Sequence, residues 1–137
     1  MDGLISETGA EQLVSVCRTA AGEKLRSITY FTHDDYEQVY LRSDLEADAD
    51  LSSFIGLEWH GFETTQSVYR DSELGGYRYT LRGFENGYLL RVTTQNKGVF
   101  ITTDGLTLAD YESVATALRE LLEEWERQGP PAAGEAE

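Results

Sequence analysis

Three segments in the second half of the chain, joined by short turns, restrict the possible fold more than any other feature. Each is rich in β-branched and aromatic residues and alternates in polarity, as a half-buried strand does. Asn86-Gly87 separates the first two, and this dipeptide favours a two-residue hairpin turn because both residues tolerate a positive φ. The pattern predicts a three-stranded antiparallel meander with strands at residues 77–84, 88–94 and 99–103.

Amphipathic helices are expected on both sides of these strands. Apolar residues recur at helical spacing over residues 9–21, with Thr8 as the N-cap and Gly22 as the residue that ends the helix. A second apolar stripe follows Thr107, the expected N-cap, and ends before Gly129 and two prolines. The chain therefore begins and ends its regular structure with a helix.

The segments between these elements complete the order. Residues 25–32 and 36–42 predict a second hairpin. Apolar residues at helical spacing predict a middle helix over residues 51–70, which Gly56 and Gly61 weaken. The resulting order, α-β-β-α-β-β-β-α, predicts an α+β fold in which three helices cover a five-stranded antiparallel sheet.

This order of elements resembles the roadblock/longin-like, profilin-type fold over residues 9–127. The resemblance concerns topology and length, and it implies a regulatory or adaptor module without a catalytic motif. We expect one domain at residues 9–128, an N-terminal extension at residues 1–8 and a disordered tail at residues 129–137.

The charge of the chain is strongly acidic, with 25 Asp and Glu against 11 Lys and Arg and a net charge of −14. Only Lys24 and Lys97 are lysines. This pattern is typical of adaptation to a salt-filled cytoplasm, where a Debye length of about 3 Å in molar salt screens the self-repulsion. Residues 36–42 and 98–105 are also similar to segments of small acidic haloarchaeal proteins, a resemblance that supports this compartment and supplies no function.

The same composition argues against two classes of partner. Nucleic-acid binding usually needs a basic stripe that neutralises phosphates, and an acidic chain lacks one. The sequence has neither a signal-peptide pattern at its start nor the ~18 apolar residues of a membrane span. We therefore expect a cytoplasmic protein that binds neither nucleic acid nor a membrane.

Catalytic and metal-binding motifs are weak. Cys17 lies on the apolar face of the first predicted helix and is expected to be a core residue, while His33 and His60 have no adjoining nucleophile motif. The acidic run that begins at Asp44 lacks the Gly and Glu of an EF-hand, because Ala49 and Ile55 occupy those positions. We expect no enzyme activity, no cofactor and no metal site.

Arginines gather on the predicted hairpin. A turn at Asn86-Gly87 would place Arg82 opposite Arg91, with Arg78 further along the same face. Like charges directly opposite each other need compensation. Carboxylates of a covering helix are the favoured explanation, and a pocket for a small anionic ligand is the alternative.

Aromatic residues suggest an interface. In a roadblock-type sheet, the strand that carries Tyr77 and Tyr79 would form an exposed edge. Trp59 and Phe62 belong to the predicted middle helix. Pairing of two such edges predicts a C2 homodimer, whereas an ordinary core position explains the same residues equally well. The sequence thus favours a non-enzymatic, dimerising regulatory or adaptor module that meets a partner protein; the alternative is a sensor of a small anionic ligand.

Overall fold

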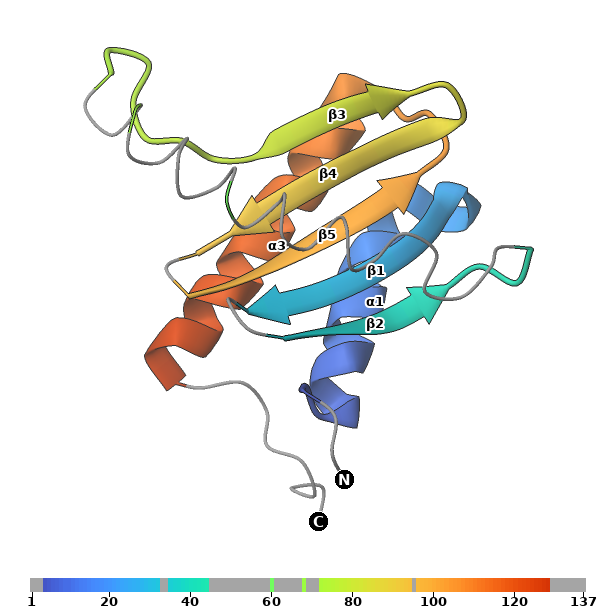
Figure 1. Cartoon of the computed structure of the whole chain (residues 1–137), viewed down its shortest axis with the longest axis horizontal. Helices are drawn as coiled ribbons and strands as arrows, with labels where there is room; N and C mark the ends of the chain where they lie inside the picture. Colours follow the sequence, from blue (N-terminus) through green and yellow to red (C-terminus); the bar gives the residue numbers. More distant parts are fainter. Residues whose placement is uncertain are drawn as a thin grey trace.

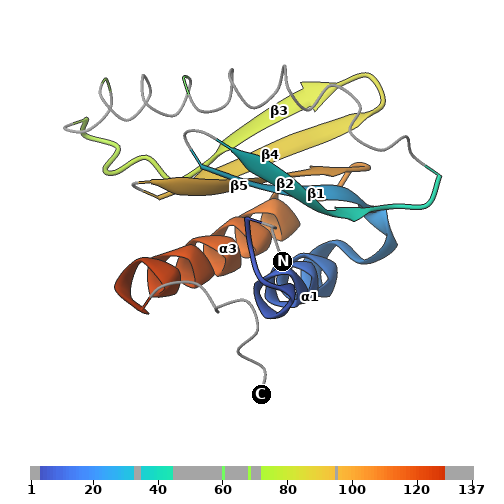
Figure 2. The same cartoon turned by 60° about the horizontal axis from the view of Figure 1, so that its bottom comes forward.

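A five-stranded antiparallel sheet, with helices on one of its faces, is the framework of the structure (Figure 1). The computed structural model describes residues 4–32, 35–44, 60, 68, 72–94 and 96–128. In this part of the chain the strands are β1 (Leu25–Thr32), β2 (Tyr36–Leu41), β3 (Thr80–Phe84), β4 (Gly87–Thr93) and β5 (Lys97–Thr103), in the spatial order β2-β1-β5-β4-β3. Figure 2 shows α1 (Glu7–Ala21) and α3 (Leu108–Gln128) on the same face of the sheet, and a 3₁₀ turn (Gly22–Lys24) joins α1 to β1.

The predicted α+β class and the five-stranded antiparallel sheet are confirmed. The described part of the chain contains two of the three expected helices. The predicted middle helix (residues 51–70) and the predicted tail (residues 129–137) lie outside the described residues, apart from His60 and Val68, which are helical and exposed.

The start of α1 is fixed by Ser6 and not by the predicted Thr8. Ser6 is extended (φ −72°, ψ 165°), and its Oγ accepts a hydrogen bond from the N–H of Gly9 at 3.1 Å. Gly9 fits tightly beside Ile5, because a Cβ there would lie 2.8 Å from Cγ1 of Ile5. The predicted end of the helix is confirmed, since Gly22 has a φ of 57°, which favours glycine.

The core lies between the two helices and the sheet. Its fully buried side chains include Leu13, Leu118 and Leu122 from the helices, and Leu90 from β4. Cys17 is 0 % exposed within this cluster, and burial raises the pKa of its thiol to about 12. The core position predicted for Cys17 is therefore confirmed, and its thiol is poorly suited to nucleophilic chemistry.

The face of the sheet turned away from α1 and α3 is buried as well. Phe31, Leu89 and Phe100 alternate with helix-facing residues and are at most 2 % exposed. Gly98 is paired with Phe31, and a Cβ at Gly98 would lie 2.7 Å from Cζ of the Phe31 ring. Glycine at this position lets the aromatic ring of β1 pack directly against β5.

The β3–β4 hairpin differs from the predicted register. Phe84 pairs with Gly87, so Glu85-Asn86 forms the two-residue turn, one residue before the predicted Asn86-Gly87. A Cβ at Gly87 would lie 2.7 Å from the carbonyl oxygen of Thr103. Glycine is thus needed at position 87 for close approach to β5 and not for a positive φ.

Candidate functional site: the β3 edge and its arginines

β3 forms one edge of the sheet, where it pairs with β4 and with no other strand of the described residues. The two-residue turn makes Phe84 and Gly87 a hydrogen-bonded pair, so alternate residues of β3 direct their main-chain groups away from β4. These outward residues are Leu81 and Gly83. An edge with outward N–H and C=O groups is a template for a further strand. The edge position predicted for this segment is confirmed.

The segment that leads into β3 is held against α3. Arg119 donates a hydrogen bond from Nη1 to the carbonyl oxygen of Tyr77 at 3.3 Å, and the hydroxyl of Tyr79 donates to Oε2 of Glu112 at 3.2 Å. The guanidinium of Arg78 lies 5.9 Å from the centre of the Tyr79 ring. Burial and the nearby Glu112 carboxylate raise the pKa of Tyr79. Residues 77–79 and α3 therefore form one continuous surface beside the open edge.

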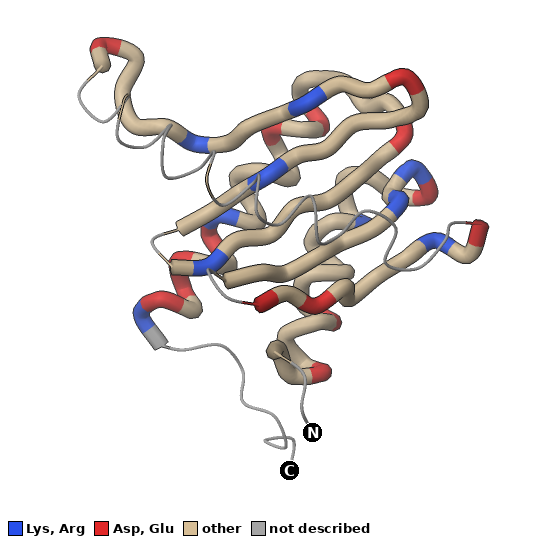
Figure 3. The backbone as a smooth tube through the Cα atoms, in the orientation of Figure 1, with Lys and Arg blue, Asp and Glu red and all other residues tan. Residues whose placement is uncertain are grey.

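Two adjoining hollows follow this surface, with volumes of about 230 and 460 Å³. Arg78, Thr116 and Glu120 line both of them. Arg119 and Glu123, which form an ion pair of 2.9 Å, line the smaller one. Figure 3 shows basic residues along the β3–β4 hairpin and acidic residues along α3. Charges of both signs next to an open strand edge are typical of the polar rim of a protein interface.

Arg91 lies inside the protein and not on its surface. It is 1 % exposed, and its Nη2 donates hydrogen bonds to the Tyr77 hydroxyl at 2.5 Å and to Oγ1 of Thr80 at 2.8 Å. The guanidinium also lies 5.8 Å from the centre of the Tyr77 ring. These contacts fix the guanidinium on the sheet face opposite the two helices.

The three predicted ligand-binding arginines lie in different surroundings, and their role in binding a ligand stays a prediction. The expected pairing of Arg82 with Arg91 is wrong, because Arg82 lies opposite Leu89 and Arg91 lies opposite Thr80. Arg78 is exposed beside α3, where its Nη2 donates to Oγ1 of Thr116 at 3.4 Å. Neither hollow that Arg78 lines includes Arg82 or Arg91. The observed register makes Arg82 and Arg91 diagonal neighbours on one face of the hairpin, whereas the predicted turn would have placed them directly opposite each other.

The structure describes two of the four residues predicted for a dimer interface, Tyr77 and Tyr79. Trp59 and Phe62 lie outside the described residues. The hydroxyl of Tyr77 contacts Arg91, on the sheet face opposite the helices, whereas the hydroxyl of Tyr79 contacts Glu112 on α3. The two tyrosine side chains therefore point to opposite faces of the sheet. Their shared role in an interface stays a prediction.

A cluster of charged residues at the end of the sheet where the β3–β4 turn lies was not predicted. Asp104 accepts hydrogen bonds from Nη1 of Arg26 at 3.2 Å and from Nη1 of Arg42 at 2.9 Å. Asp44 also binds Arg42, at 2.7 Å from Nε. Hydrogen bonds from Arg42 hold the pKa of both Asp44 and Asp104 below its usual value. The order of the strands could have indicated this cluster, because the start of β1, the end of β2 and the end of β5 meet at one end of the antiparallel sheet.

Metal sites and membrane spans are both missing from the part of the chain that the structure describes. Within residues 4–32, 35–44, 60, 68, 72–94 and 96–128, no three His, Cys, Asp or Glu side chains are grouped to hold a metal ion. None of the helices among these same residues is both long and apolar enough to cross a membrane.

The fold and its open edge define a class of protein, the roadblock-like α+β domains. The structure is similar to MglB with a tetrameric arrangement (TM-score 0.59, 13% identity, 90% of this chain and 98% of that chain covered). It is also similar to the gliding protein MglB from Thermus thermophilus (TM-score 0.60, 12% identity, 90% and 99% covered). A roadblock/LC7 domain from Streptomyces avermitilis matches as well (TM-score 0.54, 11% identity, 83% and 94% covered).

Within this class, the chain belongs to the family described as domain of unknown function DUF7522, whose sequence model matches residues 11–123. No curated protein matches the sequence significantly. The identities of the solved structures are low, so these similarities establish the fold, and the roadblock-like topology inferred from the order of elements is confirmed.

Proposed function

We propose that this protein is a non-enzymatic regulatory or adaptor module that forms a homodimer through the edge of β3 and thereby presents a binding surface to a partner protein. The observation that carries the proposal is the open edge of β3, whose alternate main-chain groups point away from β4. A twofold axis beside this edge would pair two β3 strands in antiparallel fashion and extend the sheet across both copies. One similar structure, MglB with a tetrameric arrangement, gives independent support for self-association of the fold.

The surface that flanks the edge suits such a dimer. The basic side chains of Arg78 and Arg119 and acidic side chains of α3 give it both signs of charge; the acidic residues are Glu112, Glu120 and Glu123. A twofold axis can then bring opposite charges together across the interface. The two copies each carry a net charge of −14, so their mutual repulsion weakens as salt shortens the Debye length. The dimer is therefore expected to strengthen with KCl, in keeping with a proposed high-salt cytoplasm.

A proline at Gly83 tests the edge directly. Gly83→Pro removes an outward N–H and leaves the hydrogen bonds of Phe84 to β4 in place. In a twofold dimer the variant loses this intermolecular hydrogen bond twice, and each hydrogen bond contributes about 0.5–1.5 kcal/mol. We therefore expect the dimer dissociation constant to rise roughly tenfold. Gly83→Ala is the matched control, since it keeps the N–H. Equal dissociation constants for the two variants, measured by sedimentation in molar KCl, would place the interface elsewhere.

A further inference from the structure

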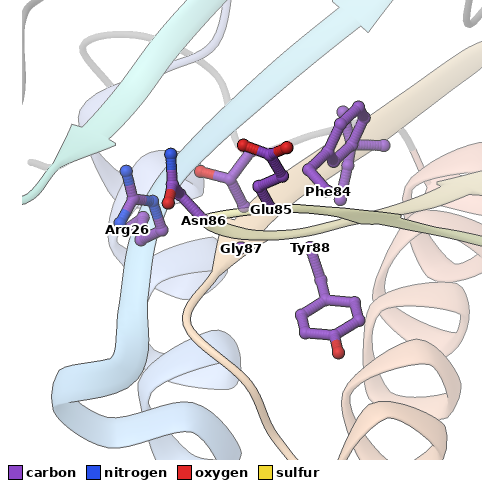
Figure 4. A pocket seen from close by; sticks show the side chains of 8 residues that line it. Arg26, Phe84, Glu85, Asn86, Gly87 and Tyr88 are labelled. Carbon is purple, nitrogen blue, oxygen red and sulfur yellow. The ribbon is translucent and has the colours of Figure 1, made fainter.

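A small pocket lies at the tip of the β3–β4 hairpin, away from the α3 surface. Its volume is about 210 Å³, below the roughly 300–1,000 Å³ of pockets for drug-sized ligands, so it fits only a small molecule. Figure 4 shows Arg26, Asn86, Glu85 and Phe84 on one side of the hairpin, while Tyr88 points to the other side. In this view Arg26 and Asn86 mark one end of the pocket and Phe84 marks the other, with Glu85 between them.

The Arg26 end offers donors for a carboxylate. A guanidinium has five N–H donors in a planar fork. The structure describes one ion pair of Arg26, from Nη1 to Oδ1 of Asp104 at 3.2 Å, which orients the group. Asp104 is itself fixed by Arg42 at 2.9 Å. The side-chain amide of Asn86 adds N–H donors beside the guanidinium.

The charge around this end favours a ligand with both signs over a simple anion. Arg26 and Arg42 are balanced by Asp44 and Asp104, whose ion pairs link all four side chains. Glu85 then adds a further carboxylate at the pocket. This carboxylate would repel a free anion, whereas it would attract an ammonium group.

The other end of the pocket is apolar. Phe84 is 56 % exposed and Leu89 is 2 % exposed, so the pocket has a ring at its rim and a buried aliphatic side chain in its wall. Gly87 keeps the wall free of a side chain, because its close approach to Thr103 excludes a Cβ. An aliphatic or aromatic group of a few carbon atoms would be removed from water here.

We infer that this pocket binds a free amino acid with an apolar side chain. The carboxylate contacts Arg26 and Asn86, the ammonium contacts Glu85, and the side chain packs on Phe84 and Leu89. The inference does not depend on dimerisation through β3, because Phe84, the β3 residue involved, pairs with Gly87 and directs its main-chain groups to β4, away from the open edge.

Ligand analogues test this assignment on the unmodified protein. The probes are L-leucine, L-leucinamide, which lacks the carboxylate, and 4-methylpentanoate, which lacks the ammonium group. In a two-dimensional NMR titration, L-leucine is expected to shift the Gly87 and Tyr88 amides and the side-chain amide of Asn86. Each analogue should bind at least roughly tenfold more weakly, because each loses one charge-assisted contact, and tenfold corresponds to about 1.4 kcal/mol.

Variants provide the second arm. Glu85→Gln should weaken L-leucine roughly tenfold, whereas 4-methylpentanoate, which no longer meets the Glu85 carboxylate, should bind at least as well as before. Glu124→Gln on α3 is the control for loss of an exposed carboxylate outside the pocket and should leave both affinities unchanged. Absence of shifts up to the solubility limit of L-leucine would overturn the proposal. Equal binding of the three probes, or an equal effect of Glu85→Gln and Glu124→Gln, would also overturn it.

Discussion

The hydroxyl of Tyr77 lies 2.5 Å from Nη2 of Arg91, a guanidinium that is 1 % exposed. This contact joins the segment before β3 to the interior of the sheet. The same hydroxyl is hydrogen-bonded to Oγ1 of Thr80, so the first residue of β3 belongs to the same cluster. The position of the edge strand, on which the proposed interface depends, is therefore tied to a buried charge.

Tyr77→Phe is expected to destabilise the protein by about 1.5–3 kcal/mol, because hydrogen bonds to buried charged groups contribute that much. Tyr79→Phe is the matched variant. Its hydroxyl meets Glu112 near the surface, so a loss below about 1 kcal/mol is expected. Denaturant unfolding at constant KCl measures the free energy of unfolding of each variant. Equal losses would show that the hydrogen bond to Arg91 stabilises the protein no more than the hydrogen bond to Glu112 does.

Gly98→Ala is expected to destabilise the sheet by about 1–3 kcal/mol, as overpacked cores do. The added Cβ would lie 2.6 Å from Cγ2 of Thr93 and 2.7 Å from Cζ of Phe31. Gly76→Ala serves as the control, because no heavy atom of the described residues, apart from its two chain neighbours, lies within 4 Å of a Cβ at that position. Thermal unfolding should separate the two variants by several degrees. A Gly98→Ala protein as stable as Gly76→Ala would contradict the packing of Phe31 against β5.

Asp104→Asn is expected to lower the melting temperature near neutral pH and to have less effect in acid. Hydrogen bonds from Arg42 are the largest cause that holds the pKa of Asp104 below its usual 3.8. A carboxyl with a lowered folded-state pKa contributes stability above its unfolded pKa, and this contribution is lost as the pH falls through the folded pKa. The difference between wild type and Asp104→Asn should therefore shrink below a pH of about 4.

Circular dichroism melts at about pH 7 and pH 3 measure this difference. The exposed Glu124 supplies the control variant Glu124→Gln, which should differ little from wild type at either pH. The Asp104 carboxylate is partly exposed, at 42 %, so solvent screens its ion pairs and the effect is modest. A constant loss at both pH values would show that Asp104 does not act through its charge.

Local sequence signals predicted the elements well, because alternation and helical periodicity are properties of short segments. Residues 25–32 were predicted as a strand and form β1 without change. Thr107 was predicted as a cap, and its Oγ1 accepts a hydrogen bond from the N–H of Asp110 at 3.1 Å. Once the strands and terminal helices were placed, the order of elements was sufficient to indicate the roadblock-like topology.

Long-range contacts decided the rest. The Asn86-Gly87 signal predicted the hairpin but not its register, because Gly87 is needed for approach to Thr103 on β5. The contact between Asp104 and Arg42 joins residues 62 positions apart, which no local pattern reveals. The expected pairing of Arg82 with Arg91 was wrong for the same reason, since the register of the hairpin places Arg82 opposite Leu89.

The molar mass of the wild-type protein in solution tests the central claim most directly. Light scattering across a dilution series, in low and in molar KCl, distinguishes a monomer of 15.3 kDa from a dimer of twice that mass. We predict a dimer in molar KCl that dissociates as the salt is lowered, because screening relieves the repulsion between two copies of net charge −14. A mass of 15.3 kDa at every protein and salt concentration would contradict a homodimer formed through the β3 edge.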